Sequence, residues 1–398
     1  MANDQVNSIT QSVSQHYTNA VISGEQLCCP TGYNHEDLGK FIPEAVLKIS
    51  YGCGTPVGLS TVQPGEVVLD IGSGGGIDCF EASRRVGEAG KVIGIDMTDE
   101  MLALARTHAP TVAENLGYPT SNVDFRKGFA DAMPVENGQI DLIISNCVIN
   151  LAPDKKKVFQ EMYRVLRPGG RFTISDIVAD QPIPNYLLYD NVKWGDCLSG
   201  SLTIQDYWSG LRDAGFLGLH QMTVTPWRVI DGIHFISVTL TGYKVVEASS
   251  SFSPVFATFT GPFSQATNEL GTIFHRGVPQ QIDEQTVNVL ALPSYKDFFV
   301  LADRPIALTN KDPQWIAVHP EDASCVWKGH FAVLMGPFLS VSDDDDHTYL
   351  SGEPLEICSK TLKVLEHSKY QSSFGVINRA RESVTAEPVI GMASTGCC

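Results

Sequence analysis

Three of the ten cysteines in the chain have surroundings that set them apart. Cys53 lies between two glycines, Cys147 follows a serine and an asparagine, and Cys197 follows the segment Trp-Gly-Asp. Thiolates bind soft ions or take part in redox chemistry, and a cysteine can also pack simply as a small apolar side chain. The sequence contains no Cys-x-x-Cys pair, so a local zinc knuckle is not expected.

A glycine-rich turn directly follows an apolar run in the segment VVLDIGSGGG, which begins at Val67. Gly72 and Gly74 let the backbone turn tightly and approach a ligand closely. Asp96 ends the next apolar run, 20 residues after Gly76, where a carboxylate can bind both ribose hydroxyls of a nucleotide. Taken alone, this arrangement also fits a nicotinamide-dependent dehydrogenase.

Two further carboxylates favour a cofactor that has no pyrophosphate. Asp70 precedes the glycines, where it would repel a pyrophosphate, and Asp131 follows a third apolar run, where it can meet an adenine amino group. The whole set resembles the class I S-adenosylmethionine (SAM) methyltransferases. A glycine turn used only for packing would leave these carboxylates at the strand ends without a purpose.

The elements that must position these residues alternate between strands and helices from about residue 61 to 180. Strands are expected at 67–71, 92–96, 123–126, 140–145 and 171–175, and helices at 76–86, 99–115 and 155–166. This alternation predicts an α/β fold with a doubly wound, mostly parallel sheet, the Rossmann-like sheet of class I methyltransferases. Residues 184–216 look helical, and 217–245 carry two alternating stretches that predict a closing hairpin.

The predicted organisation has four parts. Residues 1–60 form a polar preamble, which in such enzymes can fold back over the cofactor, and 61–248 form the methyltransferase domain with its site. After a serine linker at 249–251, residues 252–365 form a smaller C-terminal α+β domain of unassigned role. Residues 366–398 are expected to be a mobile tail that ends in two cysteines.

The fold can bring the three cysteines together. Ligands of open α/β sheets bind beyond the carboxyl ends of the strands. Cys147 follows the strand expected at 140–145 and therefore lies at that edge. Cys197 follows the next strand, on a segment that usually roofs the substrate, and Cys53 belongs to the preamble. Three thiols from distant parts of the sequence can thus converge on one pocket.

The segments that carry these cysteines resemble the arsenite methyltransferase family. The shared motifs are Tyr-Gly-Cys-Gly at 51–54, Asp-Met-Thr at 96–98, Ser-Asn-Cys-Val-Ile-Asn-Leu at 145–151 and Trp-Gly-Asp-Cys-Leu-Ser-Gly at 194–200. Arg276-Gly277-Val278 and Asp283-Glu284-Gln285-Thr286 resemble the C-terminal domain of that family, and Cys397-Cys398 its cysteine-rich tail. The family often has glutamate where this chain has Asp196, a change that conserves charge.

The resemblance implies that Cys53, Cys147 and Cys197 bind trivalent arsenic and that SAM methylates it, giving methylated arsenicals for detoxification. It also implies that Cys28 or Cys29, with Cys28 slightly favoured, forms a transient disulfide during turnover. An external thiol reductant such as glutathione or thioredoxin is then needed. The residues expected around SAM are Tyr51, Gly52, Asp70, Gly72, Gly74, Asp96, Met97, Ala130, Asp131 and Asn146.

The other cysteines have simpler interpretations. Cys79, Cys325 and Cys358 are expected to be buried packing residues, since free cysteine is among the most buried residue types. Cys397 and Cys398 either capture arsenic or merely end a disordered tail.

Composition restricts the partners. The chain has 28 basic and 45 acidic residues, a net charge of −17, which argues against nucleic acid or an anionic membrane as a partner. A polar N-terminus and the lack of a long apolar run predict a cytoplasmic protein. Two other functions stay open: a methyltransferase for a carbon, oxygen or nitrogen of a small metabolite, and a non-catalytic thiol protein that sequesters soft metals or metalloids. The first leaves the three cysteines unexplained, and the second leaves the cofactor site unused.

Overall fold

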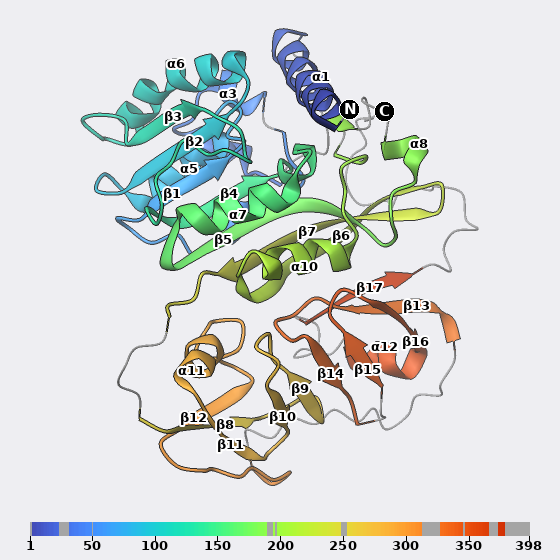
Figure 1. Cartoon of the computed structure of the whole chain (residues 1–398). Coiled ribbons are helices and arrows are strands. Elements are labelled where there is room, and N and C mark those ends of the chain that lie inside the picture. The colour runs from blue at the N-terminus through green and yellow to red at the C-terminus, as the bar shows by residue number, and fades with distance from the viewer. Residues whose placement is uncertain are drawn as a thin grey trace.

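The computed structural model describes residues 2–23, 32–49, 51–188, 194–195, 197–247, 253–312, 327–344, 347–365 and 373–378. A large sheet with helices on both faces forms the first unit of the chain, and several small sheets form the second (Figure 1). The candidate cysteines that can be placed, Cys53, Cys147 and Cys197, all belong to the first unit. Cys28 and Cys29 lie outside the described residues.

The large sheet has seven strands in the order β3-β2-β1-β4-β5-β7-β6. They are β1 (Val67–Ile71), β2 (Lys91–Asp96), β3 (Val123–Lys127), β4 (Ile140–Asn146), β5 (Leu166–Ala179), β6 (Leu217–Ile230) and β7 (Ile233–Tyr243). Strands β1 to β5 are parallel, and the hairpin β6–β7 adds to β5 in the antiparallel direction. This confirms the predicted doubly wound sheet. The order reverses between β1 and β4, which places a ligand crevice at their carboxyl ends.

Helices cover both faces of this sheet. Successive side chains along a strand point to opposite faces, so they are buried under different layers of helices. The main helices are α5 (Ile77–Val86), α6 (Asp99–Asn115), α7 (Lys155–Val165) and α10 (Ile204–Asp213); shorter ones are α2 (His35–Leu38), α3 (Glu44–Leu47), α4 (Pro56–Leu59), the 3-10 turn Ile149–Leu151 and α8 (Asn185–Leu188). Val68 packs under α5 and α6, and its neighbour Leu69 packs on the α7 and α10 side. Both are fully buried, and each such burial contributes roughly 1.5–3 kcal/mol. These two layers fix the strand ends that form the site.

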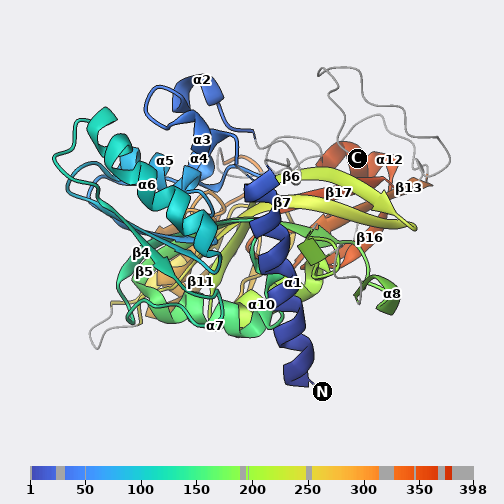
Figure 2. The ribbon, with the colours of Figure 1, turned by 90° about the horizontal axis from the view of Figure 1, so that it is seen from above.

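A long N-terminal helix, α1 (Ala2–Ser23), was not expected from the polar preamble. Ile9, Val13 and Ala20 form its buried stripe at helical spacing. The helix lies beside α6 and crosses the edge of the first unit (Figure 2). In the described part of the chain, neither α1 nor any other helix is long and apolar enough to span a bilayer.

The described residues of the second unit form three small antiparallel sheets and two helices. The sheets have the orders β10-β9-β14-β15, β11-β8-β12 and β16-β13-β17. The elements are β8 (Val255–Phe259), β9 (Gln265–Thr267), β10 (Ile273–His275), β11 (Pro279–Ile282), α11 (Glu284–Leu290), β12 (Phe299–Ala302), β13 (Trp327–Leu334), β14 (Ser340–Ser342), β15 (Thr348–Leu350), β16 (Pro354–Cys358), α12 (Ser359–Leu365) and β17 (Phe374–Asn378). Aromatic side chains, such as the fully buried Phe259, Phe263 and Phe274, dominate the core of this unit.

Strand β17 corrects the expected mobile tail. The tail was predicted to begin at residue 366, but Phe374–Asn378 pairs with β13 and closes one of the small sheets. A single short strand whose pairing partners lie 40 to 48 residues away carries little local signal. The predicted serine linker and the terminal cysteines lie outside the described residues.

Candidate functional site

A pocket opens at the carboxyl ends of β1, β2 and β4. The empty space in it, including open solvent at its mouth, is about 1210 Å³. All ten residues expected around a cofactor line it: Tyr51, Gly52, Asp70, Gly72, Gly74, Asp96, Met97, Ala130, Asp131 and Asn146. Eight of them lie at or just after the carboxyl ends of the parallel strands β1 to β4, which meet at one edge of the sheet, and Tyr51 and Gly52 come from the segment before α4.

The glycine turn is held open by backbone geometry and by one carboxylate. Gly72 has φ +72°, and a Cβ there would lie 2.3 Å from a methyl carbon of Val148, so only glycine fits. The backbone N–H of Gly74 donates to Asp96 at 2.9 Å, and that of Thr98 donates to the other carboxylate oxygen at 2.8 Å. Asp96 thereby joins the turn after β1 to the end of β2.

The pocket is acidic, and no lysine, arginine or histidine occurs among the described residues that line it. Burial raises the pKa of Asp70 well above its usual range, and the neighbouring Asp78 adds to that rise. Burial also raises the pKa of Asp78 to about 6 and raises the pKa of Asp96. Crowded, buried carboxylates favour a cationic ligand and repel phosphate groups. This disfavours a nicotinamide dinucleotide and suits SAM, which carries a sulfonium and an ammonium group.

The three candidate cysteines meet at one end of the pocket. Cys147 and Cys197 line it, and Cys53 forms a disulfide with Cys147, with their Cα atoms 5.8 Å apart. The Cys197 thiol donates to the backbone carbonyl of Cys147 at 3.2 Å. Cys147 and Cys197 have φ values of 57° and 60°, and only one other described non-glycine residue has a positive φ. Such backbone strain concentrates at functional sites.

Asn146, the last residue of β4, binds the segment that carries Cys53. Its Oδ1 accepts the backbone N–H groups of Cys53 at 3.0 Å and Gly54 at 3.2 Å. Its Nδ2 donates to the Gly54 carbonyl at 2.8 Å. A Cβ on Gly52 would lie 2.4 Å from the Asn146 side chain, and one on Gly54 would lie 2.4 Å from Ser175 Oγ. The glycines beside Cys53 therefore allow the close approach that brings its sulfur to Cys147.

The same amide belongs to a buried polar network that the sequence did not indicate. The Tyr33 hydroxyl donates to Asp78 at 2.6 Å, and Asn146 Nδ2 lies 3.1 Å from that hydroxyl. Burial and the nearby Asp78 raise the pKa of Tyr33 well above its usual range, so the hydroxyl stays protonated and can donate. Asp78 lines the pocket from the start of α5. Its role depends on contacts between distant segments, which no local motif reveals.

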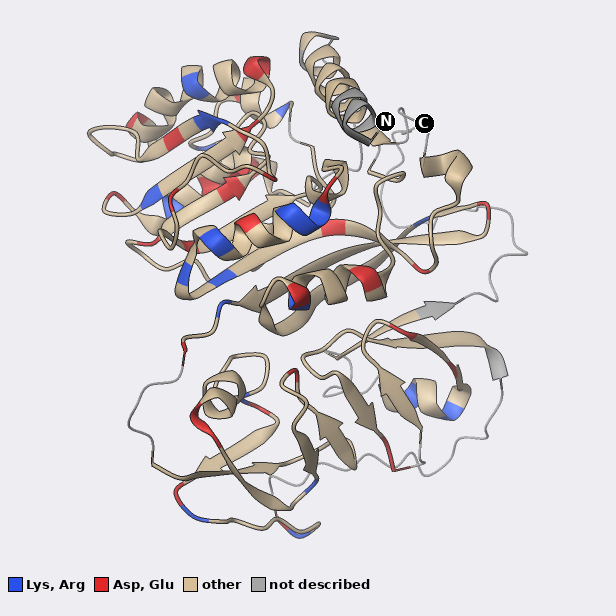
Figure 3. Cartoon of the chain, viewed as in Figure 1, with Lys and Arg blue, Asp and Glu red and all other residues tan. Residues whose placement is uncertain are grey.

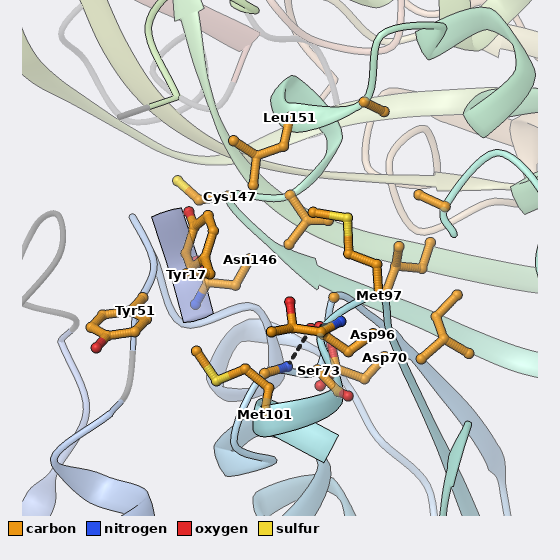
Figure 4. A pocket seen from close by; sticks show the side chains of 18 of the residues that line it. Tyr17, Tyr51, Asp70, Ser73, Asp96, Met97, Met101, Asn146, Cys147 and Leu151 are labelled. Atoms are coloured by element: carbon orange, nitrogen blue, oxygen red, sulfur yellow. Dashed lines mark hydrogen bonds between the residues drawn. The ribbon is translucent and has the colours of Figure 1, made fainter. Parts of the chain in front are cut away.

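Helix α1 closes one side of the pocket through Thr10 and Tyr17, two residues missed from the sequence. Figure 4 shows Tyr17 beside Cys147 and Asn146. The Tyr17 hydroxyl donates to the Gly195 carbonyl at 3.4 Å, close in sequence to Cys197. The stripe formed by Ile9, Val13 and Tyr17, spaced four residues apart, was a helical signal that could have identified α1.

The remaining cysteines separate into two groups. Cys79 and Cys358 are buried, as expected of packing residues. The Cys79 thiol donates to the Asp70 carboxylate at 3.2 Å, and burial raises its pKa well above the usual value. Cys325, Cys397 and Cys398, like Cys28, Cys29 and Asp196, lie outside the described residues, so their predicted roles stay predictions.

Two families of known proteins match separate parts of this chain. Residues 63–215 match a family described as a methyltransferase domain. Residues 256–323 and 321–394 match a family described as a domain of unknown function. The first match covers the parallel strands and the glycine turn, and the second covers the small sheets.

The individual relatives with high similarity to this chain include several arsenite methyltransferases. The arsenite methyltransferase of Mus musculus is 31% identical over 319 residues, which cover 73% of this chain and 82% of the mouse protein. That of Halobacterium salinarum is 42% identical over 205 residues, 49% of this chain and 50% of that protein. This chain thus spans about half the length of the archaeal relative.

A solved structure agrees with these relatives. The crystal structure of an arsenic(III) S-adenosylmethionine methyltransferase from Chlamydomonas reinhardtii superposes with a TM-score of 0.51 at 26% identity, covering 88% of this chain and 97% of that one. With the sheet order described above, this confirms the class I methyltransferase fold and the resemblance seen in the cysteine motifs. The chain therefore belongs to the family of S-adenosylmethionine-dependent arsenite methyltransferases.

Proposed function

We propose that this protein methylates trivalent arsenic bound by cysteine thiolates: arsenite by those of Cys53, Cys147 and Cys197, and methylarsenite, which has only two exchangeable hydroxyls, by two of the three. The meeting of these cysteines at one end of an acidic pocket is the observation that carries the proposal. The methylated arsenicals produced would serve detoxification. Curated relatives named arsenite methyltransferases support the same substrate.

The residues present fit SAM as the cofactor. Asp96, at the end of β2, would hold the ribose hydroxyls, and Asp131 with Ala130 would meet the adenine amino group. The carboxylates of Asp70 and Asp78 would face the positive charges of the cofactor. When bound, SAM supplies an electrophilic methyl group on a sulfonium. The protein's own task is to exclude water and to orient the arsenic toward that group.

Arsenic suits a site made of thiols because it is a soft ion. Each cysteine thiol replaces one hydroxyl of arsenous acid, forming an As–S bond, breaking an As–O bond and releasing one water. Three sulfurs leave the arsenic lone pair on the fourth side, toward the pocket. A lone pair carries no proton, so no general base is needed, unlike in most methylation of oxygen or nitrogen. Positioning alone can then contribute roughly 7–11 kcal/mol.

The function is tested by incubating the protein with arsenite, a thiol and SAM, and then separating the arsenic species. Monomethylated and dimethylated arsenic are the expected products, together with S-adenosylhomocysteine. Arsenite binding without consumption of SAM would instead indicate a sequestering protein. SAM consumption on a metabolite, insensitive to replacement of the cysteines, would indicate a different methyltransferase.

A reductant is expected to be essential, because the linked Cys53 and Cys147 cannot both bind arsenic until their disulfide accepts two electrons. A dithiol such as thioredoxin, or two glutathione molecules, would supply them and become oxidised. We expect protein kept oxidised to bind arsenite at least about tenfold more weakly than reduced protein, since two of three ligands are lost. Calorimetric titration with arsenite checks this. Equal arsenite affinity, with the disulfide verified by mass spectrometry, would contradict it.

SAM affinity is expected to fall as the pH drops from about 7.5 to about 5. Because burial raises the pKa of Asp78 to about 6, this carboxylate is charged above that pH and neutral below it. A neutral Asp78 no longer attracts a cationic ligand. Asp78→Asn should weaken SAM binding at pH 7.5 by about tenfold and flatten the pH dependence.

The matched control for this prediction is Asp99→Asn. Asp99 is an exposed acid at the start of α6 that pairs with Lys127 outside the pocket. Isothermal titration of both variants with SAM at several pH values checks the prediction. An Asp78→Asn variant with unchanged affinity and unchanged slope would reject the role of this carboxylate.

A further inference from the structure

A buried glutamate of the second unit binds the first unit at the end of α10. The side chain of Glu269 is fully inaccessible to solvent. Its carboxylate accepts the backbone N–H groups of Gly218 and of Leu219, the latter at 3.3 Å, where β6 begins. Arg212, in the last turn of α10, donates to the same carboxylate at 3.4 Å. The two units are thus joined by a buried contact between a carboxyl group and a guanidinium group.

The second unit holds α10 at other points along its length. The other guanidinium nitrogen of Arg212 donates to Ser351 Oγ at 2.7 Å. In the first turn of the helix, Gln205 donates to Glu353 at 3.0 Å. A Cβ on Gly352 would lie 2.7 Å from the Cα of Gln205, so the two backbones are in close contact. Figures 1 and 3 show α10 between the large sheet and the second unit, with charged residues toward both of its ends.

A continuous chain of hydrogen bonds runs from α10 to Cys197. The Tyr207 hydroxyl, on α10, donates to Asp176 at 3.4 Å, and the backbone N–H of Asn150 donates to the same oxygen at 3.1 Å. The Asn150 side chain donates to Ser201 Oγ at 3.4 Å, and Ser201 Oγ donates to the Cys197 carbonyl at 2.8 Å. All five residues are buried. The segment between Cys197 and α10 is therefore fixed at both ends.

We propose that the second unit acts as a clamp on α10 that positions Cys197 for arsenic, with Arg212 and Glu269 as positioning residues. The proposal rests on the proposed function, because Cys197 matters as an arsenic ligand. It gives a role to a unit whose matched family has no known function. Cys197 needs such support because its left-handed backbone is disfavoured unless its surroundings hold it there.

The test measures how well Cys197 is held, independently of arsenic chemistry. Cys197 is 1% exposed, so opening of its segment raises the rate at which iodoacetamide alkylates it, and peptide mass spectrometry follows that rate. Arg212→Ala is expected to raise the alkylation rate about tenfold and the KM for arsenite by a similar factor, with the Kd for SAM changed less than about twofold. Arg212→Lys should recover part of the loss, since it keeps a positive charge beside Glu269.

Two further variants separate positioning from general stability. Ile357→Ala creates a cavity in the core of the second unit, on β16 and thus in another sheet than β9, which Glu269 follows, and should lower Tm without raising Cys197 alkylation. Tyr207→Phe removes one hydroxyl from the chain of hydrogen bonds and should raise alkylation about threefold. It also serves as the test should Arg212→Ala not fold.

The proposal is overturned if Arg212→Ala leaves the alkylation rate of Cys197 unchanged. If Arg212→Ala does not fold, an unchanged rate in Tyr207→Phe overturns it. It is also overturned when Ile357→Ala raises the rate as much as Arg212→Ala does. The alkylation rates can be measured even if the unaltered protein does not methylate arsenite. Failure of the clamp and failure of the proposed function are therefore distinguishable.

Discussion

Cys147→Ser is expected to lower kcat/KM for arsenite methylation at least about 100-fold, while the Kd for SAM changes less than about twofold. Serine keeps the shape of the side chain but offers a hard oxygen in place of a soft sulfur. The backbone N–H of Cys147 still donates to the Ser175 carbonyl at 2.8 Å, so the end of β4 keeps its position. Cys197→Ser should behave alike, because the thiol of Cys197 faces the same end of the pocket.

The measurement combines separation of arsenic species with calorimetric titration of SAM. Cys358→Ser is the matched control, because it replaces an equally buried thiol of the second unit, where no arsenic site is proposed. Full methylation by Cys147→Ser or by Cys197→Ser would end the assignment of arsenic ligands. Loss of SAM binding in either variant would show that the change disturbs the pocket rather than the ligand.

Local patterns were sufficient to predict most of the first unit. Strand β1 at Val67–Ile71 and helix α6 at Asp99–Asn115 begin and end where their apolar patterns do. Strand β5 was predicted at 171–175 but runs over Leu166–Ala179. Its C-terminal extension pairs with the antiparallel strand β7 up to Ala179, and Leu166 at its start pairs with Ile140 of β4. Residues 184–216, which look helical, include the turn at Cys197, whose positive φ no helix adopts. Pairing and strain of this kind come from distant partners.

The residues of the candidate site also divide into those that local sequence patterns predicted and those that only packing between distant segments reveals. Asp96 and Asn146 could be placed at the pocket because both end parallel strands, and the carboxyl ends of such strands share one edge. Tyr17 and Asp78 could not, because they reach the pocket through the packing of α1 and α5. The clamp on α10 was equally invisible, since Glu269 looks like any surface carboxylate until the two units are seen packed together.

Gly52→Ala is expected to damage the site more broadly than any cysteine replacement, because the new Cβ would lie 2.4 Å from Asn146 Cγ. Asn146 must then rotate and lose its hydrogen bonds to Cys53 and Gly54. Overpacking of this kind costs about 1–3 kcal/mol of stability. Misplacement of Cys53 by about 1 Å should lower kcat/KM for arsenite about 100-fold. Since Gly52 and Asn146 also line the cofactor pocket, SAM binding should weaken as well.

Thermal unfolding, SAM titration and arsenite kinetics together check this expectation, with Gly58→Ala as the matched control. Gly58 lies in α4 of the same segment, and a Cβ there would lie 3.4 Å from its nearest neighbour, Thr55 Oγ1, an ordinary contact. That variant should keep its activity and lose no stability, because alanine is favoured in helices. Asn146→Ala removes the same hydrogen bonds without a clash and should reproduce the loss of arsenite methylation. Normal activity in Gly52→Ala would mean that the contact between this segment and β4 does not place Cys53.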